Sequence, residues 1–177
     1  MSLHTRICDV FGIEVPIVLA GMGGASTPEL VAAVSNAGGL GILGAATCGP
    51  ERLRRWIGRT RELTDRPFGV DTLLPASVRR GATRDSGGPS PADRLPEYRK
   101  FAAEFMEREK LGAFPKEAGG AEARSGERRA AMFSKDFFDA QMEVVIDEGV
   151  PVYAAGLGSP GSWVERLHDQ GCVVMSV

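Results

Sequence analysis

Short apolar runs alternate with amphipathic segments along this chain, and glycines stand at the joints between them. The apolar runs occupy residues 16–21, 40–46, 67–75, 150–156 and 172–177. Continuous apolar runs of about 4–8 residues are typical of strands buried on both faces of a parallel sheet. Strands and helices in this alternation form βαβ units, which require right-handed crossovers. The pattern predicts an α/β protein with about five parallel strands.

Helices are expected between these strands, over residues 26–38, 48–65, 134–149 and 159–171. Ser26 and Glu29 have the spacing of a capping box, in which each side chain bonds a backbone N–H of the first turn. Ser134 and Ser159 are predicted to cap the last two of these helices. The alternation fits an open doubly wound sheet and part of an eight-stranded (β/α)8 barrel equally well, because periodicity does not distinguish the two.

The alternation breaks over residues 76–133, which are rich in Gly, Pro, Ser and Arg. Residues 90–112 place apolar side chains on one face of an amphipathic helix: Leu95, Tyr98, Phe101, Ala102 and Phe105. The remainder has the composition of loop. We interpret residues 1–177 as a single domain, in which residues 76–133 form an insert of loop and one helix.

Composition excludes several classes of function. A formal net charge of -2 gives no electrostatic basis for binding nucleic acid. No apolar run approaches the ~20 residues of a transmembrane helix, so no membrane partner is expected. Cys8, Cys48 and Cys172 are widely spaced without a CxxC pair, which favours reduced thiols in the cytoplasm. His4 and His168 are the only two histidines in the sequence, so no metal site is predicted.

Ligands bind at the carboxyl ends of the strands in both candidate architectures. Here those ends carry mostly glycine and small side chains, in residues 21–24, 45–47 and 156–158. Such a wall suits a flat polar ring such as a flavin or a nucleotide base, although ordinary tight turns have the same composition. Asp71 is the ionisable residue at a strand end within an apolar run, and a buried carboxylate needs a partner. No nucleophile–base pair is visible, so no catalytic residue is assigned.

Three blocks of the sequence, residues 5–45, 62–74 and 150–177, resemble the nitronate monooxygenase family in the family's own order. This family, also called 2-nitropropane dioxygenase-like, includes related flavin-dependent enoyl-acyl-carrier-protein reductases. The resemblance implies a (β/α)8 TIM barrel that binds FMN without covalent attachment. It also implies oxidation of alkyl nitronates, the small-molecule substrate, by O₂ to a carbonyl compound and nitrite.

The resemblance further implies which residues bind the cofactor. Ala20, Gly21, Met22 and Gly23 match the first-strand turn whose backbone lies against the flavin ring. Asp71 matches a position usually held by Asn, which hydrogen-bonds the polar edge of the flavin. An ionised carboxylate accepts hydrogen bonds but does not donate them, and its charge disfavours an anionic reduced flavin.

The family sequence continues past the fifth strand with an "AQG…GGH" segment, which carries the catalytic His, and with glycine-rich turns that hold the FMN phosphate. This sequence contains neither. We therefore expect a truncated, partial barrel that alone binds FMN weakly and turns over no nitronate. Two alternatives stay open. One is a non-catalytic half-barrel that self-associates through its open strand edges, and the other is an enzyme like the enoyl-acyl-carrier-protein reductases.

Overall fold

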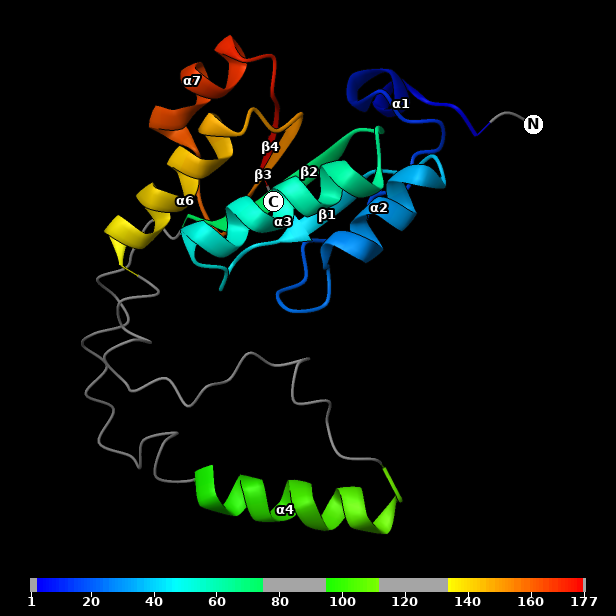
Figure 1. The fold of residues 1–177 in the computed structure, drawn as a ribbon, viewed down its shortest axis with the longest axis vertical. Helices are drawn as coiled ribbons and strands as arrows, with labels where there is room; N and C mark the ends of the chain where they lie inside the picture. The colour runs from blue at the N-terminus through cyan, green and yellow to red at the C-terminus, as the bar shows by residue number, and fades with distance from the viewer. Residues whose placement is uncertain (1–2, 75–94, 112–133, 177) are drawn as a thin grey trace. The chain divides into compact units, whose positions relative to one another are not determined.

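The computed structural model describes residues 3–74, 95–111 and 134–176. The chain divides into two compact units, residues 1–78 with 124–177 and residues 79–123. The first unit is built around a parallel four-stranded sheet with the order β1-β2-β3-β4 (Figure 1). Its strands are β1 (Gly41–Gly44), β2 (Phe68–Leu73), β3 (Val152–Gly156) and β4 (Val173–Ser176).

Helices connect these strands as the alternation predicts. In the first unit they are α1 (Arg6–Phe11), α2 (Pro28–Asn36), α3 (Pro50–Leu63), α6 (Lys135–Asp147), the 3-10 turn η2 (Gly161–Trp163) and α7 (Val164–Asp169). The strand order follows the chain order with no reversal, whereas a doubly wound sheet reverses at its switch point. The sheet is therefore part of a (β/α)8 barrel, which confirms the fold class and settles the choice that periodicity left open.

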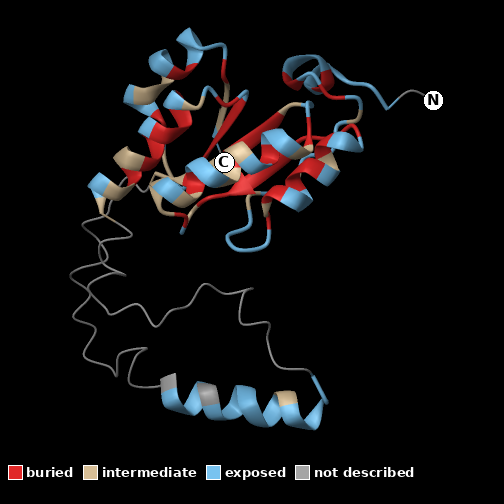
Figure 2. Cartoon of the chain, in the orientation of Figure 1, coloured by how far each residue is buried: buried red, intermediate tan, exposed pale blue. Residues whose placement is uncertain are grey.

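The two faces of the sheet pack against different partners. Leu43, Val70 and Tyr153 lie side by side in register and point to the helix-covered face, where they join the larger hydrophobic core. Leu53 and Ile57 of α3 are fully buried in the same core. The sheet and the inward faces of these helices are the buried parts of the first unit (Figure 2).

The opposite face, which is the barrel interior, has its own smaller core. Ile42 and Val152 pack there with Cys8 and Phe11 of α1 and with Ile13, which follows it. Helix α1 thus covers the amino-terminal end of the interior face. The sequence did not predict this helix, because six residues are too few to show a helical period.

Residues 16–21 were predicted to form a strand that is buried on both faces, and this prediction is wrong. Only an isolated parallel bridge forms there, between Val18 and Leu40. Leu19 N–H donates to the Leu40 carbonyl and Leu40 N–H donates to the Ile17 carbonyl, at 2.9 Å in both cases. Ile17 and Val18 are 61% and 41% exposed. The segment has no described strand on its other side, so the interior hydrogen bonds of a central strand are missing. The sheet accordingly has four strands rather than five.

The predicted N-terminal helix caps are confirmed only in part. Ser134 caps α6 as expected, since its Oγ accepts a hydrogen bond from Phe137 N–H at 3.2 Å. Ser159 Oγ accepts from Gly161 N–H, but the helix that follows begins as the turn η2. The capping box at Ser26 is wrong, because α2 has Thr27 at its N-cap and no side-chain cap there.

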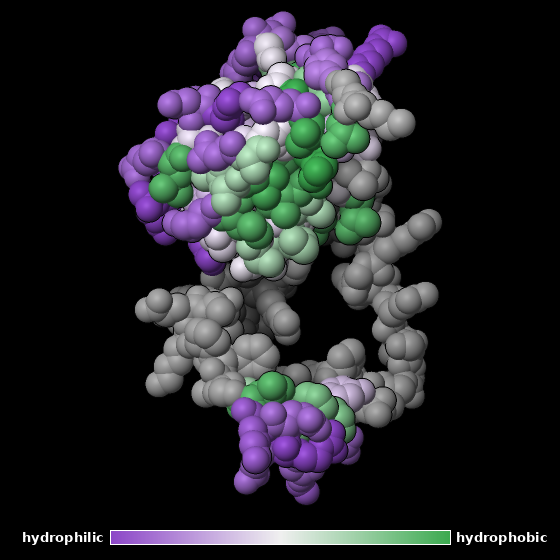
Figure 3. Space-filling view, turned by 90° about the vertical axis from the view of Figure 1, so that its right-hand side faces the viewer, coloured by the Kyte–Doolittle hydropathy of each residue, from purple (hydrophilic) through white to green (hydrophobic). Residues whose placement is uncertain are grey.

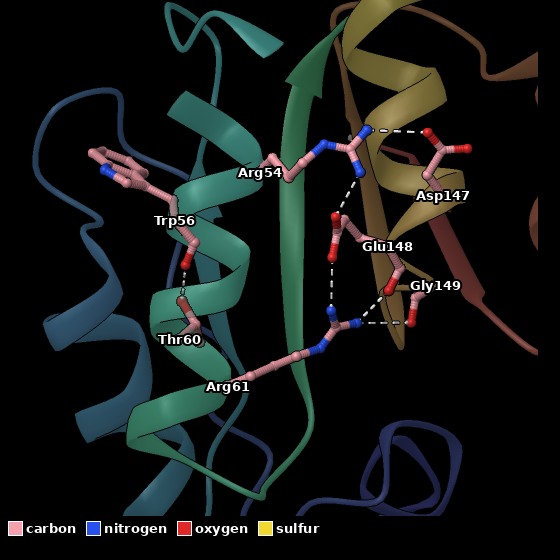
Figure 4. A network of polar contacts seen from close by, with 7 residues as sticks. All are labelled: Arg54, Trp56, Thr60, Arg61, Asp147, Glu148 and Gly149. Atoms are coloured by element: carbon pink, nitrogen blue, oxygen red, sulfur yellow. Dashed lines mark hydrogen bonds and ion pairs between the residues drawn. The ribbon is translucent and has the colours of Figure 1, made fainter. Parts of the chain in front are cut away.

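An ion-pair network joins α3 to the end of α6 (Figure 4). Arg54 pairs with Asp147 at 3.1 Å and with Glu148 at 2.8 Å, while Arg61 reaches the other carboxylate oxygen of Glu148 at 3.0 Å. Arg61 also donates to the backbone carbonyls of Glu148 and Gly149. Glu148 therefore holds two cations that lie two turns apart on α3.

The second unit contains helix α4 (Leu95–Arg108), within the amphipathic helix predicted at residues 90–112. The rings of Phe101 and Phe105 stack with their centroids 6.3 Å apart, and both side chains are exposed. The remaining loop prediction for residues 76–133 lies outside the described residues. Among the helices described, none is long and apolar enough to cross a membrane.

Candidate active-site edge

The carboxyl ends of the four strands bring the candidate residues to one edge of the barrel interior. The register places Gly44, Asp71, Ala154 and Met175 beside one another across the sheet. Paired residues of a parallel sheet point to the same face, and this row alternates with the helix-facing row of Tyr153. Asp71 is thus the ionisable member of an otherwise small or apolar row on the interior face.

The turn after residues 16–19 is shaped by Ser26. Its Oγ donates to the Ala20 carbonyl at 2.8 Å and accepts from Met22 N–H at 3.1 Å. Its carbonyl accepts from Gly44 N–H at 3.3 Å, which ties the turn to the end of β1. Ser26 is fully buried. The sequence assigned it to a helix cap, and its spacing gave no sign of this second role.

Asp71 lies between two glycine backbones. A side chain on Gly21 would collide with Asp71, since its Cβ would come within 3.0 Å of the carboxylate and of Asp71 Cβ. A Cβ on Gly156 would lie 3.2 Å from Asp71 Oδ1. Of the predicted site residues, the structure therefore brings Gly21 and Asp71 together, while Met22 is 45% exposed on the turn above. Whether these residues bind a cofactor stays a prediction.

The electrostatics of Asp71 are unusual for a carboxylate. Oδ1 is buried and has no hydrogen-bond partner. Burial raises the pKa of Asp71 from 3.8 to about 6, because the charged form loses solvation and nothing replaces it. Within the part of the chain that the structure describes, Asp71 forms no ion pair. The group therefore changes its charge close to neutral pH.

The neighbouring turn after β1 is held from outside by Gln141 of α6. Its Nε2 donates to the carbonyls of Ala45 and Cys48 at 2.7 and 2.6 Å. Gln141 is fully buried, and its Oε1 has no partner. A single Gln in a helical segment gives no sequence signal of such a contact, so this support was not predicted.

The turn after β3 completes the edge. Leu74 N–H donates to the Gly156 carbonyl at 2.8 Å, which keeps the ends of β2 and β3 together. Leu157 adopts φ 58 and is 71% exposed. Ser176 Oγ at the end of β4 donates to the Gly158 carbonyl at 3.3 Å. A Cβ on Gly158 would overlap the Leu74 carbonyl, so this position accepts only glycine.

The histidines lie away from this edge. His4 is beside Asp9 of α1, which packs at the amino end of the sheet, and His168 is exposed near the end of α7. No group of three His, Cys, Asp or Glu residues suited to a metal occurs among residues 3–74, 95–111 and 134–176. Two open hollows of about 470 and 450 Å³ lie elsewhere, one beside Pro50 and Arg54 and one beside Thr64 and Gly149.

The residues of the edge fit a flat, partly polar ring. Gly23 has nothing within 4 Å of its Cβ position, so the turn offers an open backbone surface there. Asp71 Oδ1 is a buried polar atom that lacks a partner, which a ring with N–H and C=O groups along one edge would supply. The described residues of the edge include no cation for a phosphate, and no nucleophile of the edge is hydrogen-bonded to a His.

Comparison with known proteins identifies the family of this chain. The family model for nitronate monooxygenase matches residues 4–177. A probable nitronate monooxygenase of Staphylococcus saprophyticus is 47% identical over 76 residues, which are 43% of this chain and 21% of that protein. A Rhodococcus jostii 5-hydroxy-7a-methyl-1-oxo-octahydro-1H-indene-4-carboxyl-CoA dehydrogenase is 45% identical over 76 residues, 43% of this chain and 22% of its own length.

Solved structures match over nearly the whole chain. FabK from Thermotoga maritima superposes with a TM-score of 0.60 and 29% identity, over 98% of this chain and 37% of FabK. Nitroalkane oxidase from Streptomyces ansochromogenes gives a TM-score of 0.58 and 29% identity, over 97% of this chain and 42% of its own. The chain thus covers about a fifth of the length of these curated relatives and about two fifths of these structures.

Proposed function

Because the chain belongs to the nitronate monooxygenase family, over residues 4–177, we propose that it forms the flavin-ring side of an FMN-dependent site for oxidising alkyl nitronates with O₂. The proposal rests on one observation. The turn at residues 20–24, the half-buried carboxyl of Asp71 and the bare backbone of Gly156 meet at the carboxyl edge of the barrel interior.

Each of these residues has a distinct part in the proposal. The backbone of Ala20, Gly21, Met22 and Gly23 forms the wall for the ring, and Ser26 fixes the shape of that wall. Asp71 supplies a polar contact for the ring beside this wall. FMN, when bound, supplies the redox chemistry, which protein side chains lack. The buried interior face below Asp71 excludes water from one side of the ring.

Thioesters are a second candidate class of substrate. FabK and the CoA-ester dehydrogenase are similar to this chain to about the same degree as the nitronate enzymes. We therefore propose, as the second candidate, a reductase-like enzyme that acts on a thioester with the same flavin edge. The two candidates differ in reductant and substrate, so they are separable by assay.

We also propose that the protein self-associates through its open strand edges. Ile17 and Val18 expose apolar surface on one edge, and β4 has no described strand on its far side. Apolar surface gathers on one face of the folded first unit (Figure 3). Dilution across micromolar concentrations in sedimentation velocity should reveal a monomer–dimer equilibrium, and a single monomer at all concentrations would contradict it.

Two further proposals concern organisation and location. We propose that residues 76–133 are an insert within one incomplete barrel domain, which is compatible with a separate compact unit at residues 79–123. We also propose a cytoplasmic location, because Cys8, Cys48 and Cys172 are all free and buried, as expected in a reducing compartment.

The test of the main proposal is cofactor and substrate selectivity of the purified 177-residue chain. Titration with FMN, FAD and riboflavin should quench flavin fluorescence saturably. Nitrite release from a nitronate above that of free FMN, or NAD(P)H oxidation with an enoyl thioester, would identify the substrate class, and either activity would overturn the expectation that this chain alone is inactive. Absence of saturable flavin binding to the folded chain would contradict both candidates.

A further inference from the structure

The carboxyl of Asp71 is half-buried, and no opposite charge lies beside it among the described residues. Gly21 lies against Oδ2 and Cβ, and Gly156 lies against Oδ1. Oδ1 is buried and has no hydrogen-bond donor. A buried carboxylate with no donor is unfavourable in its charged form, so any group that covers it further must either donate to it or meet it protonated.

Among the described residues packed around Asp71, none offers a compensating charge. The turn at residues 20–24 contains no ionisable side chain, and the neighbours of Asp71 in register are Gly44 and Ala154. Met175 follows in the same row on β4. Tyr153 points to the opposite face, and burial raises the pKa of its hydroxyl, so it is neutral near pH 7. The pKa of Asp71, about 6, reflects burial alone.

We propose that Asp71 contacts the flavin ring as a neutral carboxylic acid, so that flavin binding takes up one proton. This inference rests on the proposed function, since it concerns the same edge. A protonated carboxyl presents one O–H donor beside one acceptor oxygen. That pair matches a ring edge with an N–H beside a C=O, whereas an ionised carboxylate can only accept.

Proton uptake gives flavin binding a defined pH dependence. If only the protonated form of Asp71 binds, the dissociation constant rises about tenfold for each pH unit above a pKa of about 6. Below that pH the dissociation constant is flat. Between pH values of roughly 5 and 8 the expected weakening is about 100-fold.

Riboflavin is the probe for this test, because it lacks the phosphate of FMN, whose own second ionisation lies near a pKa of about 6. Its dissociation constant is measured by fluorescence quenching from about pH 5 to about pH 8, for the wild-type chain and for Asp71→Asn. Asn keeps a donor and an acceptor at every pH. The variant should bind as tightly at about pH 8 as the wild type does at about pH 5. Asp65→Asn, at an exposed position, is the matched control and should keep the wild-type profile.

A second measurement needs no variant. Calorimetric titration in two buffers of different ionisation enthalpy gives the number of protons bound, and about one proton should enter with riboflavin at about pH 7.5. A flat wild-type profile with zero proton uptake would overturn the inference and leave the flavin site standing. Failure of both the wild type and Asp71→Asn to bind riboflavin at any pH would overturn the proposed function together with the inference.

Discussion

The carboxyl group of Asp71 occupies the space that a side chain at Gly21 would need. Gly21 lies in the turn at residues 20–24 and Asp71 lies on β2, so their contact fixes how closely this turn approaches β2. A larger residue at position 21 would collide with Asp71, so the shape of the candidate site depends on glycine at this position.

Gly21→Ala should destabilise the protein. The new Cβ would fall within 3.0 Å of Asp71 Cβ, which cannot swing away as a flexible side-chain end would. Overpacking of this kind costs about 1–3 kcal/mol. Gly23→Ala is the matched control, because its Cβ meets nothing within 4 Å and its φ is not positive. Urea unfolding of both variants measures the difference, and equal stabilities would contradict the close approach.

Asp71→Asn should stabilise the protein at neutral pH and leave it unchanged at about pH 4. The folded pKa of about 6 lies above the unfolded value of 3.8, so the folded state binds the extra proton between these values. The wild type therefore loses stability as pH rises through this window, and Asn does not titrate. Discounted for the partial exposure of Asp71, the gain above the window is about 1–2 kcal/mol.

The measurement is the free energy of unfolding of the two proteins at a series of pH values. Asp65→Asn serves again as the exposed control, and it should change the stability little. A gain for Asp71→Asn that is as large at about pH 4 as at about pH 7 would show that titration of Asp71 is not its source.

Ser26→Ala should weaken both stability and flavin binding. It removes the acceptor for Met22 N–H and the donor to the Ala20 carbonyl, and each lost hydrogen bond of this kind costs about 0.5–1.5 kcal/mol. Ser35→Ala is the matched control. Ser35 is equally buried and bonds the Pro67 carbonyl and Gly41 N–H, far from the carboxyl edge.

Both serine variants should lose similar stability in urea, but only Ser26→Ala should raise the dissociation constant for riboflavin. If Ser35→Ala weakened binding to the same extent, the effect would follow from global stability, and the role of Ser26 in shaping the turn would be refuted.

Glu148→Gln should lower stability by about 1 kcal/mol at low salt, and by less than half of that near 1 M salt. Glu148 is only 20% exposed and contacts Arg54 and Arg61 together. Glu62→Gln is the control, because Glu62 is 67% exposed and pairs with Arg59 within one helix, where such pairs contribute about 0.2–0.5 kcal/mol. Urea unfolding at both salt concentrations checks the contrast.

Four of the predicted strands and their crossover helices were correct because buried parallel strands are apolar throughout and the intervening helices are amphipathic. Residues 16–21 are equally apolar, yet they form only a bridge to Leu40. The apolar composition of a segment shows that it is suited to burial. Whether the segment pairs as a strand depends on neighbouring strands that are distant in sequence.

The candidate site was predictable in position and not in detail. Asp71 is recognisable as an ionisable residue at a strand end, but its unpartnered Oδ1 depends on two glycines brought together by the fold. Ser26 illustrates a second limit. Its spacing to Glu29 satisfies a helix cap, and the competing bonds to Ala20 and Met22 involve a turn whose path the sequence does not specify.

The register of β2 with β3, which pairs Asp71 with Ala154, closes a long connection that includes residues 75–133. The entropy of closing such a connection grows only with the logarithm of its length, so that doubling it costs about 0.6 kcal/mol. The junction between Leu74 and Ser134 is therefore a point where sequence can be gained or lost during evolution with little effect on the sheet. Leu74 bonds the Gly156 carbonyl, so this junction leaves the sheet at the carboxyl edge itself, and the residue that begins the connection also borders the candidate site.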